Sequence, residues 1–161
     1  MRPVTRARTP APRTGPPALK TACFPPENSP PDAKVNVREI RAHLRRELAG
    51  TGVDPADADL MAAEIATNAI LHTASGRPGG RVWLTVIVSP ERARIEITDQ
   101  GGTPKEPQIP HSASLNGRGL LIVQELADRW GWTRDASGRT TVWFELPRTG
   151  ETPPRNSRTS I

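Results

Sequence analysis

The amino-acid sequence predicts an α+β fold, a two-layer α/β sandwich in which helices cover one face of a mixed, mostly antiparallel sheet. Two stretches between residues 35 and 75 repeat apolar residues at helical spacing. Two later pairs of stretches alternate apolar and polar residues, and a short turn sequence joins the members of each pair. Strands joined by such short turns are antiparallel neighbours, so the sheet is expected to be built largely of hairpins.

The first expected elements are an edge strand and two helices. The strand covers Leu19–Pro25 and ends at a proline pair. The first helix runs from about Val35 to Leu48, with one apolar side. The second begins at Asp54-Pro55, because Asp is a favoured N-cap and Pro a favoured first helical residue, and it ends before Gly76. Its apolar side is expected to carry Leu60, Met61, Ile65, Ala69 and Ile70.

The remaining elements follow from alternation and turn residues. Strands are expected at Arg81–Ser89 and Arg92–Asp99, and Gly101–Asn116 has the length of a functional loop. A helix over Gly119–Trp130 and a hairpin of Trp130–Arg134 with Thr140–Leu146 complete the fold. The tryptophans are expected in the core.

Composition divides the chain into three parts: a disordered Pro/Arg-rich arm at residues 1–18, a folded domain at 19–147 and a disordered tail at 148–161. Nine of the 18 prolines lie in residues 1–33. The net charge of +5 comes from +3 in residues 1–33 and +2 in residues 148–161, because the middle carries fourteen charges of each sign. The folded part therefore lacks the basic field of a specific nucleic-acid binder.

No apolar run approaches the roughly 20 residues that a membrane span needs, and no signal peptide is visible. Cys23 is the only cysteine, so no internal disulfide can form. We expect a cytoplasmic protein that does not bind membranes.

Glu64, Asn68 and His72 recur every four residues, so on a helix they form one polar ridge. A carboxylate and a carboxamide on one face can share a hydrated Mg²⁺ ion. Asn is a poor residue in mid-helix, and a metal ligand would explain Asn68; the alternative is an amide bonded to a neighbouring strand. Glu64 is either a general base or a solvated surface carboxylate, and His72 either orients a phosphate or caps the helix.

Asp99 ends an apolar strand, where a carboxylate needs hydrogen-bond donors such as the exocyclic amine of adenine. Gly101 and Gly102 would let a base approach the backbone, although Asp-x-Gly also forms an ordinary turn. A second motif, Gly117-Arg118-Gly119-Leu120, opens a helix whose free N–H groups suit a phosphate, with Arg118 as a further contact. It could equally be a plain turn. Together the motifs predict a site for ATP and Mg²⁺.

In order and spacing these motifs resemble those of the ATPase superfamily that includes DNA gyrase B, MutL and the sensor histidine kinases. Glu64 to His72 resembles its asparagine box, Asp99-Gln100-Gly101 its first glycine box, and Gly117 to Leu120 its second. The resemblance spans roughly residues 22–147 and is strongest to small anti-sigma-factor serine/threonine kinases. It implies that Asn68 binds Mg²⁺, that Asp99 reads adenine, and that Thr141 contacts adenine through water. Thr103 stands where the family often has a further glycine.

The resemblance implies three competing functions. The first is a serine/threonine protein kinase that uses ATP and Mg²⁺ to phosphorylate a small antagonist protein, with Glu64 as the catalytic base. The second is a non-catalytic, nucleotide-dependent binder that sequesters a sigma factor or another regulator. The third is the ATP-binding part of a histidine kinase, topoisomerase or repair protein, which the short chain disfavours. The partners expected are an antagonist protein, a sigma factor or both, and the chain is expected to form a homodimer.

Overall fold

The structure, a computed structural model, describes residues 16–102 and 119–148. Most of the expected arm, loop and tail lies outside these ranges, as do Thr103, Gly117 and Arg118. Arg148, expected to begin the tail, is described: its Nε donates to the carbonyl of Thr51 at 2.7 Å and its Nη1 to that of Ser89 at 2.6 Å. The end of the last strand is thereby attached to two loops of the domain.

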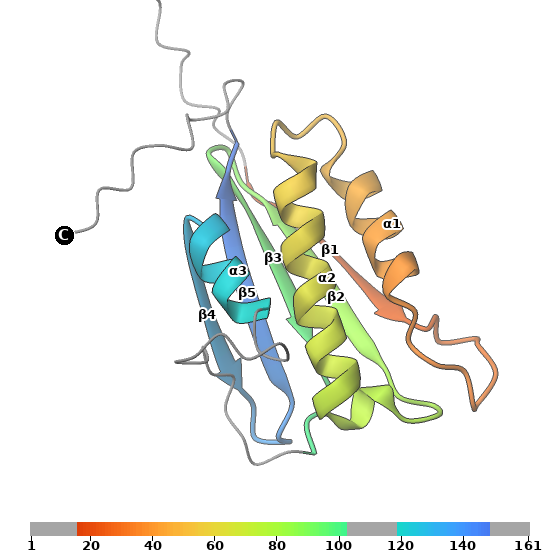
Figure 1. Cartoon of the computed structure of the whole chain (residues 1–161). Coiled ribbons are helices and arrows are strands. Elements are labelled where there is room, and N and C mark those ends of the chain that lie inside the picture. Colours follow the sequence, from red (N-terminus) through yellow and green to blue (C-terminus); the bar gives the residue numbers. More distant parts are fainter. Residues whose placement is uncertain (1–15, 103–118, 149–161) are drawn as a thin grey trace, which may run out of the picture.

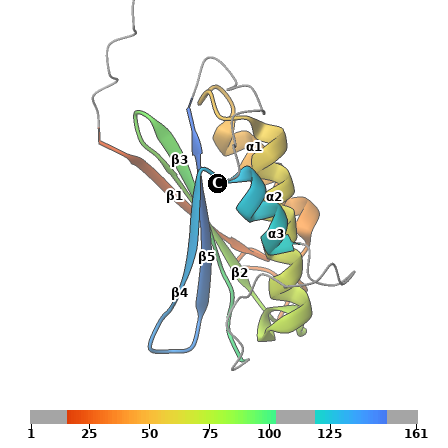
Figure 2. The same ribbon diagram turned by 60° about the vertical axis from the view of Figure 1, so that its left-hand side comes forward.

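The chain forms a sheet with helices on one side only, as the sequence predicts. Figure 1 shows the helices in front of the sheet, and Figure 2, turned by 60°, shows the other face bare of helices. The elements in chain order are β1 (Ala18–Phe24), α1 (Val37–Leu48), α2 (Pro55–His72), the 3₁₀ turn η1 (Ala74–Gly76), β2 (Val82–Val88), β3 (Arg92–Thr98), α3 (Gly119–Leu126), β4 (Arg129–Arg134) and β5 (Thr140–Pro147).

The sheet has five strands in the order β1-β2-β3-β5-β4, and each neighbouring pair is antiparallel. It is therefore wholly antiparallel in the described residues, in agreement with the expected, mostly antiparallel sheet. In β5 the side chains of Thr140, Val142 and Phe144 are buried under the helices, and those of Thr141 and Trp143 alternate onto the bare face. This alternation decides which side chains can reach a site beneath the helices.

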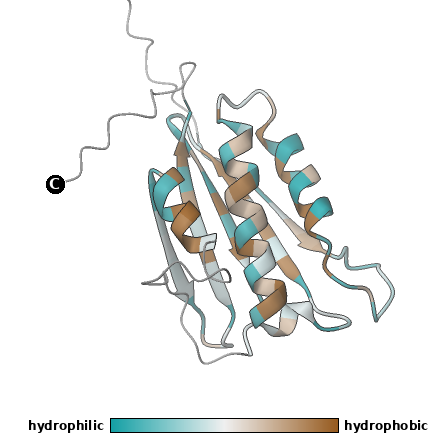
Figure 3. Ribbon diagram, viewed as in Figure 1, coloured by the Kyte–Doolittle hydropathy of each residue, from teal (hydrophilic) through white to brown (hydrophobic). Residues whose placement is uncertain are grey.

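Both long helices begin at the caps that their sequences provide. Asn36 accepts the N–H of Arg38 at 2.9 Å, and Asp54 accepts that of Ala56 at 2.9 Å. Figure 3 shows apolar and hydrophilic residues alternating along α1, whose Ile40, Leu44 and Leu48 are buried. The expected amphipathic pattern is thus confirmed for this helix.

Three expectations about individual elements are wrong. Leu60 is 43% exposed, because it lies on the same side of α2 as Glu64 rather than on its buried side. The last helix ends at Leu126 instead of Trp130, since the N–H of Asp128 already bonds to the Glu145 carbonyl of β5 at 3.0 Å. Two tryptophans, Trp83 and Trp143, lie on the bare face of the sheet and not in the core.

Arginine side chains cover the two tryptophans of the bare face. The Cζ of Arg94 lies 3.8 Å from the ring centroid of Trp143, and that of Arg139 lies 4.5 Å from the ring of Trp83. The ring of Trp143 also lies across Gly131, where an added Cβ would come within 2.7 Å of it. Guanidinium groups on flat rings cover apolar surface and present charge to water, so both rings are partly shielded on this face.

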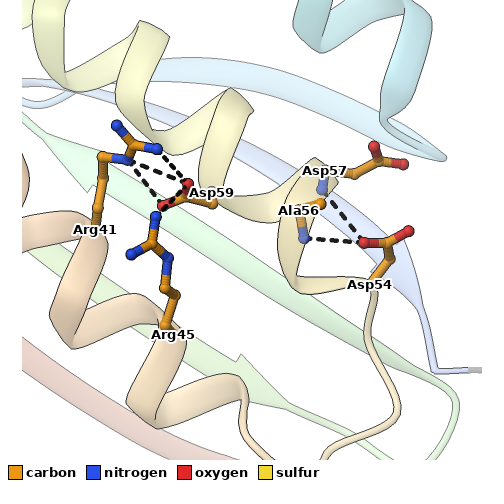
Figure 4. Close-up of polar contacts among 6 residues, drawn as sticks. All are labelled: Arg41, Arg45, Asp54, Ala56, Asp57 and Asp59. Carbon is orange, nitrogen blue, oxygen red and sulfur yellow. Dashed lines mark hydrogen bonds and ion pairs between the residues drawn. The ribbon is translucent and has the colours of Figure 1, made fainter.

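A buried carboxylate joins the two long helices. Asp59 of α2 is only 8% exposed, and it accepts hydrogen bonds from Arg41 at 2.6 Å and Arg45 at 2.9 Å, both on α1 (Figure 4). The hydrogen bond from Arg41 lowers the pKa of the Asp59 carboxyl group, Arg45 adds to the effect, and burial opposes it. This charge cluster fixes α1 against the helix that carries the polar ridge.

In the part of the chain that the structure describes, no helix is long and apolar enough to cross a membrane.

We predict that Asp59→Asn lowers the free energy of unfolding at pH 7 by about 1.5–3 kcal/mol, the usual contribution of hydrogen bonds to a charged group. Because the folded-state pKa of Asp59 lies below its unfolded value, this stabilisation is complete above the unfolded pKa and is lost as the pH falls through the folded one. Urea unfolding between pH 7 and pH 2 should therefore show a difference that shrinks in acid.

The exposed Glu27→Gln serves as the control and should change stability by less than about 0.5 kcal/mol. Equal stabilities of wild type and Asp59→Asn at pH 7, or a difference that does not depend on pH, would contradict the assignment.

Candidate functional site

The start of α3 lies directly against the polar ridge of α2. A Cβ atom added to Gly119 would lie 3.0 Å from Nδ2 of Asn68 and 3.2 Å from both Cβ and Oε2 of Glu64. Because glycine has no Cβ, the backbone at the helix start comes into contact with a carboxamide and a carboxylate at once. The structure thus brings together Glu64, Asn68 and Gly119, which come from two motifs far apart in the sequence.

The residues beside this contact differ in exposure. Leu120, the second residue of α3, is buried and fixes the start of the helix on the core. Glu64 and Asn68 are half-buried, so each is partly covered and still open on one side. His72 is the last residue of α2 and is exposed. The polar ridge therefore runs from a covered end at Glu64 to an open end at His72.

The segment after β3 is attached to the turn after α2. The N–H of Ala74 donates to the carbonyl of Gly101 at 2.8 Å, and the N–H of Gln100 donates to the hydroxyl of the fully buried Ser75 at 2.9 Å. In Figure 1 the end of α2, the end of β3 and the β4–β5 hairpin all lie at the same end of the domain. The helix layer and the sheet therefore meet at this end.

Asp99 is buried at this junction. Its Oδ1 accepts the N–H of Gly101 at 2.6 Å, which is the turn that an Asp-x-Gly sequence favours. Burial raises the pKa of the Asp99 carboxyl group, while the backbone N–H groups of Gly101 and Thr140 and the charge of Arg134 oppose the rise. A carboxylate has more lone pairs than these N–H groups use, so it can also accept a hydrogen bond from a ligand.

Glycine is required at both positions that follow Asp99. Gly101 has φ +70°, and a Cβ there would collide with the carbonyl of Gly138 in the β4–β5 turn. Gly102 has φ +87°, and its Cβ would lie 3.4 Å from the Cβ of Ala74. The backbone therefore passes closely between the β4–β5 turn and the end of α2.

The structure does not bring Thr141 to this site. Its hydroxyl lies on the bare face of the sheet, 2.7 Å from the hydroxyl of Thr98. The neighbouring Thr140 is 4% exposed and lies on the helix side, and its carbonyl accepts the N–H of Asp99 at 2.9 Å. Sequence reasoning missed Thr140 as well as Ser75, although the apolar Val142 and Phe144 at two-residue spacing mark the buried face of β5.

The described residues contain no group of three or more His, Cys, Asp or Glu side chains that could hold a metal ion. Mg²⁺ does not need such a group, because it keeps several waters and takes its remaining ligands from one or two side chains and from phosphates. The carboxamide of Asn68 and the carboxylate of Glu64 fit that requirement, with the space left by the missing Cβ of Gly119 beside them.

Comparison with known proteins identifies the class. The histidine kinase-like ATPase domain family matches residues 30–146, most of the chain, and the protein belongs to that family. Its α+β fold, with an antiparallel sheet and helices on one face, agrees with this membership. It is therefore a kinase-like ATPase domain, a class defined by binding of ATP.

Two solved structures illustrate more distant similarity. One contains the RsbU and RsbW domains of Rv1364c from Mycobacterium tuberculosis, with 22% identity, a TM-score of 0.49, and coverage of 87% of this chain and 35% of that one. The other is the histidine kinase domain of a blue-light activated histidine kinase from Erythrobacter litoralis, with 22% identity, a TM-score of 0.48, and coverage of 74% and 65%. This chain thus spans less than two thirds of either. No curated protein matches.

We predict that Asp99→Asn does not destabilise the ligand-free protein at pH 7, and that it unfolds at an equal or higher temperature than wild type. Asn keeps an oxygen to accept the N–H of Gly101 but has no charge to bury. Because the folded-state pKa of Asp99 is raised, ionisation costs stability above that pKa, and the cost disappears as the pH falls through it.

Thermal unfolding of both proteins from pH 7 to pH 4 tests this. The difference in Tm should narrow towards acid, and a variant clearly less stable than wild type at pH 7 would show that the carboxylate has a structural role.

Proposed function

We propose that this domain binds ATP with Mg²⁺ and phosphorylates a serine or threonine of a small regulatory antagonist protein, in the manner of an anti-sigma-factor kinase. The observation that carries the proposal is the contact of Glu64, Asn68 and Gly119. It places a candidate base and a candidate metal ligand against the N-terminus of a helix, where N–H groups and the helix dipole favour phosphate.

In this proposal each residue has one task. Asp99 accepts a hydrogen bond from the amine of adenine, and the neighbouring Thr140 makes the contact with adenine that the resemblance assigns to Thr141. The backbone of Gly101 and Gly102 would face the base. Gly119 and Leu120 at the start of α3, with the preceding Gly117 and Arg118, would bind the phosphates. Asn68 would hold Mg²⁺, which would neutralise phosphate charge, and His72, at the open end of the ridge, would contact the phosphates.

The reaction is an in-line transfer. The hydroxyl oxygen of the substrate protein forms a bond to the γ-phosphorus while the bond from that phosphorus to the β–γ bridging oxygen breaks, and ADP leaves. The Glu64 carboxylate accepts the hydroxyl proton. Phosphoryl transfer depends mainly on positioning and charge neutralisation, so a carboxylate of ordinary basicity suffices.

The antagonist protein, an associated sigma factor and a homodimeric state are parts of this proposal that rest on the resemblance of the motifs. A cytoplasmic location is proposed with them. The alternative is a domain that binds nucleotide and sequesters a regulator without catalysis. The half-buried Glu64 beside Asn68 favours the kinase, because a binder has no need of a carboxylate next to the phosphate site.

We predict that ATP binds at least tenfold more weakly when Mg²⁺ is removed with a chelator, and that Asn68→Ala binds ATP as weakly with Mg²⁺ as wild type does without it. Isothermal calorimetry measures both. The exposed neighbour Thr67→Ala is the matched control and should bind like wild type. If chelation leaves the affinity of wild type unchanged, Asn68 is not a metal ligand.

We predict that Glu64→Gln keeps its affinity for ATP but loses transfer by roughly 10²- to 10⁴-fold, the usual contribution of a positioned base. The assay uses labelled ATP and the small regulatory proteins encoded near the gene, and it scores phosphoserine or phosphothreonine. Thr67→Ala should transfer at the wild-type rate. If wild type binds ATP and captures a sigma factor yet labels none of these proteins, the sequestering binder replaces the kinase.

A further inference from the structure

Three polar side chains form a row across the end of the sheet that carries the candidate site. Asp99 follows β3, Thr140 begins β5, and Arg134 ends β4, with Arg134 and Thr140 directly opposite each other in the register. The buried side of β5 fixes their direction, because Trp132 and Arg134 pair with the inward-facing Val142 and Thr140. All three polar side chains therefore lie on the helix side of the sheet.

Hydrogen bonding determines which side chains of this row donate and which accept. The Nε of Arg134 donates to the hydroxyl oxygen of Thr140 at 3.3 Å. A guanidinium group can only donate, so the hydroxyl of Thr140 must accept from it, and its own proton is turned away and available to an acceptor in the site. Asp99, when ionised, can only accept. The row thus offers a donor at Thr140 next to an acceptor at Asp99.

The positive charge of Arg134 also acts on Asp99. Burial favours the protonated form of Asp99 by raising its pKa, and Arg134 is the charged side chain that opposes this. The guanidinium group itself is placed beside Trp132, with its Cζ 5.9 Å from the ring centroid. One residue thus favours both the donor state of Thr140 and the acceptor state of Asp99.

We propose that Arg134 is a positioning residue that makes the site select 6-aminopurine nucleotides over 6-oxopurine nucleotides. This rests on the proposed binding of ATP. A 6-aminopurine presents a donor at its amine and an acceptor at the adjacent ring nitrogen N1, which complements an acceptor at Asp99 and a donor at Thr140. A 6-oxopurine presents the reverse pattern. Without Arg134 the hydroxyl can turn and Asp99 can take up a proton, so the reverse pattern is accepted too.

The elements next to Asp99 carry few other charged side chains in the described residues. His72 ends α2 and is exposed, η1 contributes no titratable side chain, and the β4–β5 turn contributes the exposed Asp135 and Arg139. Arg139 lies over Trp83 on the opposite face of the sheet. It is the matched control, since it is an arginine of the same hairpin whose charge lies outside the site.

The experiment measures the affinities of ATP and inosine triphosphate, which differ only in the 6-position and its effect on N1, at constant Mg²⁺. Calorimetry at pH 7.5 and pH 5.5 compares wild type with Arg134→Ala, Arg134→Gln and Arg139→Ala. Wild type and Arg139→Ala should prefer ATP by at least tenfold. In Arg134→Ala this preference should fall by roughly tenfold or more, the effect of one hydrogen bond to a charged group, and the loss should be larger at pH 5.5.

Arg134→Gln separates the two effects. The Gln amide can still donate to Thr140 but has no charge. Arg134→Gln should therefore keep more of the preference for ATP over inosine triphosphate than Arg134→Ala at pH 7.5, and it should lose that preference at pH 5.5. Thermal unfolding checks that each variant is folded. If Arg134→Ala is not folded, the comparison of Arg134→Gln with wild type tests the inference. A folded variant with the wild-type preference at both pH values overturns the inference. Failure of wild type to bind ATP at all overturns instead the proposed function on which it rests.

Discussion

The hydrogen bonds between the end of β3 and the turn after α2 are the constraint on which the rest of the site depends. The N–H of Ala74 bonds to the carbonyl of Gly101, and the hydroxyl of the buried Ser75 accepts the N–H of Gln100. These contacts hold the strand that ends in Asp99 against the helix that carries Glu64 and Asn68. A sheet and a helix packed only by apolar side chains could slide by fractions of a residue, whereas directional hydrogen bonds fix their relative position.

Two buried aspartates show how one residue type serves opposite purposes in this domain. Asp59 is surrounded by the guanidinium groups of Arg41 and Arg45, so its charge stabilises the packing of α1 on α2. Asp99 has the backbone N–H groups of Gly101 and Thr140 and the charge of Arg134, but its burial outweighs them and raises its pKa, so its charge costs stability in the ligand-free protein. A carboxylate kept at such a cost is typical of binding sites, where a ligand can supply a further donor.

The sequence was sufficient for elements whose pattern is local. The cap at Asp54 and the alternation in β2 and β3 each follow from neighbouring residues, and the structure confirms them. The side of the sheet on which a side chain lies was harder to predict from the sequence, because it depends on the strand register. The resemblance pointed to Thr141, yet pairing with β3 turns Thr140 toward Asp99. Two of the four tryptophans, Trp83 and Trp143, face outward, where Arg139 of the β4–β5 turn and Arg94 of β3 cover them. The end of α3 was also set by a long-range contact, the bond from Asp128 to β5.

The central claim is that nucleotide lies under the helix layer, between α2 and the β4–β5 turn, and not on the bare face of the sheet. The tryptophans provide a direct measurement, because Trp132 pairs with the inward-facing Val142 whereas Trp83 and Trp143 lie on the other face. In a two-dimensional NMR titration with ATP and Mg²⁺, the indole N–H of Trp132 and the amides of Gly101 and Thr140 should shift, while the indole signals of Trp83 and Trp143 stay in place. Shifts confined to Trp83 and Trp143, or no shifts at saturating ATP, would contradict the account.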